Sequence, residues 1–145
     1  IIMLVTELAY APNQIVSSQW SSVTPIYGVS STLRKSQRKI AELSRLSVNW
    51  DTYGSCPIQP AAIERALKIL SLADRHGFTA PDIFPVPGGG IQLEWQNEKR
   101  ELELEILPDA TLEYLTVDEN KNMEEDRLSA QPDFEILNLL RWFKG

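Results

Sequence analysis

The sequence predicts an α+β fold in which a three- to four-stranded antiparallel meander packs against two or three helices. Apolar and polar residues alternate within residues 91–96 and 101–106, which is the period of half-buried strands. Apolar residues recur instead at helical spacing over residues 31–47, 60–76 and 132–144. The candidate strands follow one another through short turns, which favours antiparallel hairpins over crossover connections.

The composition is typical of a globular protein. Of the 145 residues, 43% are hydrophobic and 23% are charged, and the net charge is −6. No apolar run approaches the roughly 20 residues needed to span a bilayer. Cys56 is the only cysteine, which excludes an intrachain disulfide and suits a reducing cytosol. We therefore expect a cytoplasmic protein that has no membrane partner and needs no cofactor.

The chain begins with an arm and a basic helix. Residues 1–30 are expected to form an N-terminal arm with at most partial order, because Ser, Thr, Pro and Asn are frequent there, and residues 31–145 a single α+β domain. Residues 31–47 predict an amphipathic helix in which Leu33 and Ile40 mark the apolar stripe. Its opposite face is basic and consists of Arg34, Lys35, Arg38 and Lys39.

A turn-rich connection and a second helix come next. Trp50 and Tyr53 lie in the connection and are expected to fill the core, because aromatic rings are rarely left fully in water. Pro60 suits the first turn of a helix, and Gly77 suits the residue after its end. A helix is therefore predicted over residues 60–76.

Four further segments complete the sheet. Prolines at positions 81, 85 and 87 permit at most an edge strand at Ile83–Phe84. Gly88–Gly90 predicts a turn into the next strand, because neither the helix nor the Lys-Ser/Thr pair of a phosphate loop follows it. After the two alternating strands, a third is predicted over Thr111–Val117 and a weakly patterned fourth near Met123–Leu128.

The last helix has little polar surface. It is predicted from Pro132 to about Lys144, and most of its side chains are apolar. It is therefore either covered by the sheet or docked on another chain. In the second case the protein is a homo-oligomer, and the candidate interface residues are Phe134, Leu137, Leu140 and Trp142.

One strand register gathers carboxylates on the side opposite the core. The register that keeps the apolar face intact pairs Ile91 with Ile106, Leu93 with Leu104 and Trp95 with Leu102. The same register brings Glu94 opposite Glu103, and closing the next hairpin on Pro108–Ala110 brings Glu105 opposite Glu113. No base lies between these glutamates, and like charges directly opposite cost stability. The candidate partner-binding residues on this side are Glu94 and Glu103, Glu105 and Glu113, and the neighbouring Leu115.

The charge distribution favours a basic protein partner. Residues 91–130 hold twelve acidic and four basic residues, and such a surface attracts basic proteins and repels nucleic acid. A simpler interpretation is a solvated acidic sheet whose charges prevent aggregation. The sequence also permits a small carboxylate- or metal-dependent hydrolase that uses Glu94 and Glu103, or a nucleic-acid accessory factor that uses the basic helix 31–47.

No catalytic or metal-binding constellation is recognisable in the sequence. His76 is the only histidine and is expected at a helix C-terminus, where the helix dipole favours it. Cys56 has no evident electropositive neighbour that would activate its thiol. We therefore predict a protein that is not an enzyme.

Two motifs resemble those of a group of small uncharacterised bacterial proteins. They are the turn Asn49–Ser55, which reads NWDTYGS, and the stretch Gly89–Trp95, which reads GGIQLEW. The likeness covers about residues 45–117 and implies a bacterial cytosolic protein, without supplying an activity. Together with the charge pattern, it leads us to expect a non-enzymatic interaction module of the antitoxin, immunity or accessory-subunit kind.

Overall fold

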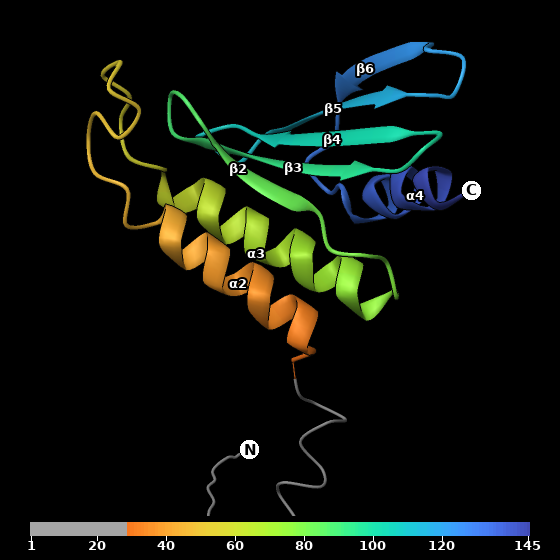
Figure 1. Ribbon diagram of the computed structural model, residues 1–145, viewed down its shortest axis with the longest axis horizontal. Helices are drawn as coiled ribbons and strands as arrows, with labels where there is room; N and C mark the ends of the chain where they lie inside the picture. The colour runs from red at the N-terminus through yellow and green to blue at the C-terminus, as the bar shows by residue number, and fades with distance from the viewer. Residues whose placement is uncertain (1–28) are drawn as a thin grey trace, which may run out of the picture. The chain divides into compact units, whose positions relative to one another are not determined.

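One five-stranded antiparallel sheet forms the centre of the fold. In the computed structural model, which describes residues 29–145, each strand pairs with the next one in the sequence (Figure 1). The strands are β2 (Asp82–Val86), β3 (Gly90–Gln96), β4 (Glu101–Ile106), β5 (Leu112–Val117) and β6 (Met123–Arg127). The sheet exceeds the predicted three to four strands because both of the weakly patterned segments pair as its edges.

The three helices that the structure describes lie on one face of this sheet. They are α2 (Ser31–Leu43), α3 (Pro60–Arg75) and α4 (Asp133–Lys144). Helix α3 contacts β3 and β4, and α4 contacts β4 and α3. Helix α2 runs alongside α3 (Figure 1). The predicted α+β class is confirmed. None of the described helices is both long enough and apolar enough to cross a membrane.

The central strands adopt the register that the alternation predicted. Strands β3 and β4 pair Ile91 with Ile106, Leu93 with Leu104 and Trp95 with Leu102. These six side chains are at most 3% exposed. They pack in one hydrophobic cluster with apolar residues of the helices, among them Ile40, Ala66, Ile69, Ile136 and Leu140. The core therefore lies between the sheet and the helices.

Helices α2 and α3 lie close to their predicted positions. Helix α3 has Pro60 in its first turn, and Gly77 follows it with a φ of +76°, a conformation that glycine adopts without a steric cost. Helix α2 buries Leu33 and Ile40 as expected. It ends at Leu43, before the predicted residue 47, and the chain continues there in a turn.

The connection between α2 and α3 corrects one expectation. Trp50 is half-buried, and its indole N–H donates to the carbonyl of Cys56 at 3.1 Å. Tyr53 is 91% exposed, so the prediction that it fills the core is wrong. The Asp51 carboxylate instead holds the loop, accepting hydrogen bonds from the backbone N–H groups of Tyr53 at 2.9 Å and Ser55 at 3.2 Å. Tyr53 is thus not needed to anchor this turn.

Helix α4 packs within its own chain. Leu140 is fully buried against the core, so its prediction as an oligomer-interface residue is wrong. Leu137 and Trp142 also pack against the core, because α3 and β4 cover the apolar side of the helix. Of the four predicted interface residues, Phe134 alone is exposed, at 71%. A homo-oligomer stays a prediction.

Residues 32–145 form one unit by their internal contacts. The predicted N-terminal arm, residues 1–30, lies outside the described residues except for Val29 and Ser30.

The glycine run turns the chain from β2 into β3, as predicted. Gly88 and Gly89 have φ values of +100° and +103°. The Gly89 carbonyl accepts the backbone N–H of Gln59 at 2.9 Å, which ties the turn to the start of α3. A Cβ atom added at Gly90 would lie 2.5 Å from the carbonyl oxygen of Ile106. The close approach of β3 and β4 therefore requires glycine at position 90.

Gly90→Ala should lower the free energy of unfolding by about 1–3 kcal/mol, because the added methyl group has to displace the backbone of β4. Gly88→Ala is the control, since nothing lies within 4 Å of its Cβ position and its cost comes from the positive φ alone. Urea unfolding measures both, and amide hydrogen exchange at Ile106 should quicken in the Gly90 variant only. Unchanged stability of Gly90→Ala would contradict the close strand approach.

Candidate protein-docking face

The side of the sheet away from the helices carries the predicted site. The outer face consists of the outward side chains of β3, β4 and β5, which are Gln92, Glu94, Gln96, Glu101, Glu103, Glu105, Glu113, Leu115 and Val117. All are half-buried except Gln96, which is exposed. The described helices pack on the opposite side (Figure 1). Within residues 29–145, no helix therefore covers the outer face.

The strand register brings the predicted glutamates together. Glu94 is paired with Glu103 across β3 and β4, and Glu105 is paired with Glu113 across β4 and β5. Leu115 is the partner of Glu103 on β5. Side chains directly opposite on antiparallel strands have Cβ atoms about 4.5–5.5 Å apart. All five predicted partner-binding residues thus lie on one continuous surface.

Glu103 lies among three other carboxylates of the outer face. Burial raises the pKa of Glu103 above its ordinary value of 4.5, and repulsion from Glu94, Glu101 and Glu105 raises the pKa further. Both causes disfavour the charged form. A cationic group from a partner would therefore stabilise the centre of the outer face, because it would relieve the repulsion between these carboxylates.

Two glutamines relieve part of the repulsion on β3 and β4. The side-chain amide of Gln92 donates to a carboxylate oxygen of Glu94, and that of Gln96 donates to Glu101 Oε2 at 2.8 Å. A neutral amide donates a hydrogen bond but brings no positive charge. The net negative charge of the outer face is unchanged by these contacts.

Glu113 differs from the other predicted glutamates, because it has a basic partner. The prediction that no base lies beside it is wrong. Strand β6 brings Arg127 opposite Glu113, and Arg127 Nη2 lies 3.0 Å from Glu113 Oε2. Both side chains are more than 40% exposed, at 65% and 41%, so this pair contributes at most about 1 kcal/mol. Strand β6 was too weakly patterned to fix its register, and the sequence could not identify this partner.

Three carboxylates that were not among the predicted binding residues lie on the same side of the sheet. Glu101 follows the alternation of β4, so its position was readable from the sequence. Asp82 on β2 is paired with Glu94, and Glu125 on β6 is paired with Leu115. Asp82 and Glu125 belong to edge strands that were hard to predict, because prolines interrupt β2 and β6 has no apolar alternation. One row of cross-strand neighbours therefore extends across all five strands.

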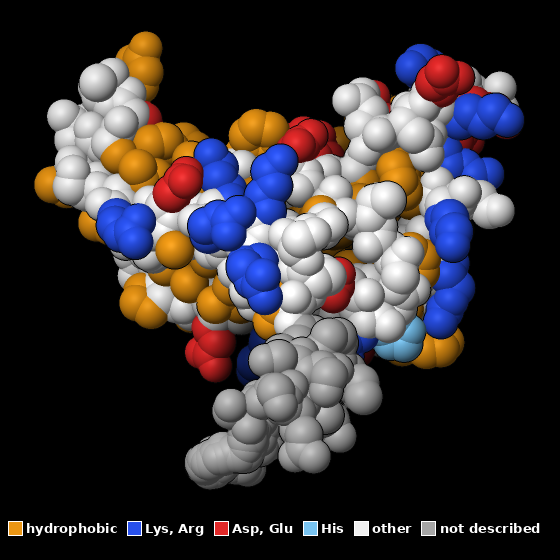
Figure 2. All heavy atoms as spheres, turned by 60° about the horizontal axis from the view of Figure 1, so that its bottom comes forward, with side chains coloured by type: hydrophobic (Ala, Val, Ile, Leu, Met, Phe, Trp, Pro, Cys, Tyr) orange, Lys and Arg blue, Asp and Glu red, His pale blue; other side chains and the backbone are white. Residues whose placement is uncertain are grey.

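The basic helix presents its charges elsewhere. Lys35, Arg38 and Lys39 are exposed on α2, opposite its buried residues. Figure 2 turns the α2 side of the molecule forward and shows Lys and Arg side chains gathered there. The protein therefore separates a basic helix from an acidic sheet, as its sequence indicated.

Glu94 and Glu103 of the outer face are also the residues of the predicted hydrolase alternative. Among residues 29–145, no group of three or more His, Cys, Asp and Glu side chains could hold a metal ion. Glu94 and Glu103 stand side by side on a sheet surface, whereas glycosidase carboxylates face each other across a bound substrate. The hydrolase alternative stays a prediction.

Comparisons of the chain with protein-family models, with curated proteins and with solved structures found no match. The resemblance of residues 45–117 to small bacterial proteins therefore stays a prediction, and the function has to be inferred from the outer face itself.

Glu103→Gln should raise the free energy of unfolding at neutral pH by about 0.2–1 kcal/mol, because it removes a charge that faces Glu94. The pKa of Glu103 is raised by folding, so the folded state holds its proton more tightly than the unfolded state does. The wild type should therefore lose stability relative to the variant as the pH rises from about 4.5. Chemical denaturation at about pH 4 and about pH 7 measures the difference.

The matched control is Glu98→Gln, which removes an exposed carboxylate from the turn between β3 and β4. It should show no comparable gain in stability as the pH rises. Equal gains for the two variants would mean that Glu103 is not specifically repelled by its neighbours.

Proposed function

We propose that this protein is a non-enzymatic interaction module of the bacterial cytoplasm, of the antitoxin, immunity or accessory-subunit kind, and that it presents its outer face to a basic protein partner. The observation that carries the proposal is the set of opposed glutamates at the centre of the sheet. Within residues 29–145, the ion pairs are Glu64 with Lys68 and Glu113 with Arg127. The charges of Glu94, Glu103 and Glu105 therefore have no basic partner among the described residues.

Edge protection does not explain these charges. Charged residues guard a sheet against aggregation when they lie on edge strands, whose backbone groups are unpaired. Strand β6 fits that role, because it is an exposed edge strand with three consecutive acids, Glu124, Glu125 and Asp126. Glu103 and Glu105 lie instead on β4, which is hydrogen-bonded on both sides. Their repulsion has no protective purpose there, which favours a binding role.

The outer face has the mixed chemistry of a transient interface. Leu115 and Val117 are half-buried beside the glutamates and offer apolar area to a partner. Complementary charge chiefly speeds association and selects the partner, whereas apolar contacts at the centre contribute most of the affinity. A basic protein surface with an apolar centre would complement both the glutamates and the apolar residues of the outer face.

A nucleic-acid accessory factor is the second candidate function. The exposed Lys35, Arg38 and Lys39 on α2 favour it. The net charge of −6 opposes it, because the protein as a whole repels a polyanion. Fluorescence anisotropy with labelled DNA and RNA distinguishes the candidates, since phosphate binding through three bases would weaken with a log-log salt slope of about −2 to −3.

Charge reversal of Glu103→Lys with Glu105→Lys should weaken binding of the partner by about tenfold or more at low salt, because two attractive charges become repulsive. The partner is first obtained by co-purification from the native host and identified by mass spectrometry. Titration calorimetry at several salt concentrations then compares the variant with the wild type, and the salt dependence of the variant should be flatter.

The control for this experiment is Glu98→Lys with Glu119→Lys, which changes the net charge equally at two exposed positions outside the outer face. It should retain most of the affinity. Equal losses in the two double variants would mean that net charge, and not the outer face, recognises the partner.

A further inference from the structure

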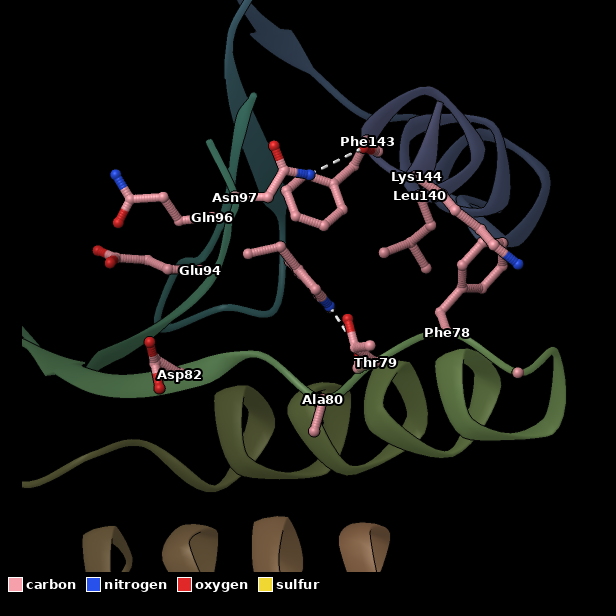
Figure 3. A pocket seen from close by; sticks show the side chains of 12 residues that line it. Phe78, Thr79, Ala80, Asp82, Glu94, Gln96, Asn97, Leu140, Phe143 and Lys144 are labelled. Atoms are coloured by element: carbon pink, nitrogen blue, oxygen red, sulfur yellow. Dashed lines mark hydrogen bonds between the residues drawn. The ribbon is translucent and has the colours of Figure 1, made fainter. Parts of the chain in front are cut away.

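A cleft lies at one end of the outer face. It has a volume of about 390 Å³ and lies between the chain that leads into β2, the end of β3 and the C-terminal turn of α4 (Figure 3). Its apolar wall includes the half-buried Phe78 and Phe143, and its polar groups include Asp82 and Glu94. The cleft is therefore amphipathic, with aromatic rings and carboxylates within one hollow.

The cleft exists because β2 pairs with only part of β3. The pairing begins at Asp82, the partner of Glu94, and Trp95 and Gln96 lie beyond it. The chain before β2 is held by a different contact, in which the indole N–H of Trp95 donates to the carbonyl of Thr79 at 2.7 Å. This side-chain contact replaces strand pairing and leaves space beside the buried Trp95 ring.

The charges in the cleft are separated. Figure 3 shows Asp82 and Glu94 at one end and Phe78 with Lys144 at the other. Lys144 Nζ lies 5.9 Å from the centroid of the Phe78 ring, a distance typical of a cation–π contact. The described residues pair neither Asp82 nor Glu94 with a base. The acidic end of the cleft therefore favours an added cation.

The acidic end continues directly into the outer face. Asp82, Glu94 and Glu103 are successive cross-strand neighbours on β2, β3 and β4. A ligand group bound between Asp82 and Glu94 would therefore lie next to Glu103. The cleft and the outer face can contact one partner at the same time.

We propose that the cleft receives an arginine side chain of the basic partner, with its guanidinium between Asp82 and Glu94 and its aliphatic stem along the ring of Phe143. This inference rests on the proposed function and names the residue type that anchors the partner. Arginine fits better than lysine because its planar group donates to two carboxylates at once and packs on aromatic rings. Arginine is also enriched among the residues that dominate binding at interfaces.

The test uses N-acetyl-arginine amide as the probe and NMR spectroscopy of the full chain. Trp95 provides the readout, because its indole N–H lies at the cleft and gives a resolved signal. The arginine probe should shift this signal in a saturable way, and N-acetyl-citrulline amide, which is neutral and nearly isosteric, should not. Equal shifts with both probes would overturn the proposal.

Two variants give opposite expected results. Asp82→Asn should weaken probe binding by roughly two- to fivefold, and Lys144→Gln should strengthen it by up to about twofold by removing a like charge. Asp82 is exposed and Lys144 is exposed, so neither change disturbs the core. Unchanged binding by Asp82→Asn, or weaker binding by Lys144→Gln, would show that the carboxylate end does not hold the probe.

This test can fail independently of the proposed function. If charge reversal at Glu103 and Glu105 abolishes partner binding but the arginine probe leaves the Trp95 signal unmoved, the outer face binds the partner and the cleft inference is wrong. If the probe binds as expected but charge reversal leaves partner binding unchanged, the cleft holds arginine and the proposed function is wrong.

Discussion

The register of β3, β4 and β5 is the constraint on which the rest of this structure depends. Side chains alternate between the two faces of a strand, so a shift of one residue would move Glu103 into the core and Leu104 into solvent. The observed register places Leu102, Leu104 and Ile106 inside, where they are fully buried. The same register necessarily collects Glu101, Glu103 and Glu105 on the other side. Core and acidic surface are thus two results of one alignment.

The fold tolerates repulsion on its outer face because the free energy gained by burying the core is larger than the cost of that repulsion. Burial of one large aliphatic side chain contributes about 1.5–3 kcal/mol, and β4 alone buries three. Opposed carboxylates cost about 0.2–1 kcal/mol per pair. The core therefore outweighs the repulsion without any compensation from the chain. A partner that neutralises the face would recover that smaller energy on binding, which links the local cost to the proposed function.

The sequence predicted the parts of the fold in which local pattern and packing agree. The alternation in β3 and β4 predicted their register, and the short turn at Pro108–Ala110 placed Glu113 and Leu115 of β5 on the same surface as Glu94, Glu103 and Glu105. It could not locate Arg127 opposite Glu113, because β6 has no apolar alternation, or Asp82 opposite Glu94, because prolines interrupt β2. Tyr53 was placed wrongly for a similar reason. Its exposure depends on hydrogen bonds made by Asp51, which hydrophobicity does not predict.

Carboxylate labelling of the complex tests the central claim most directly. Carbodiimide coupling of glycine ethyl ester, quantified by mass spectrometry, reports the accessibility of each acidic side chain in the free protein and in the partner-bound protein. Glu94, Glu103 and Glu105 should lose labelling in the complex, while Glu64 on α3 and Glu98 in the β3–β4 turn keep theirs. Unchanged labelling of the three outer-face glutamates, with protection at Glu64 instead, would contradict the assignment of the sheet as the docking surface.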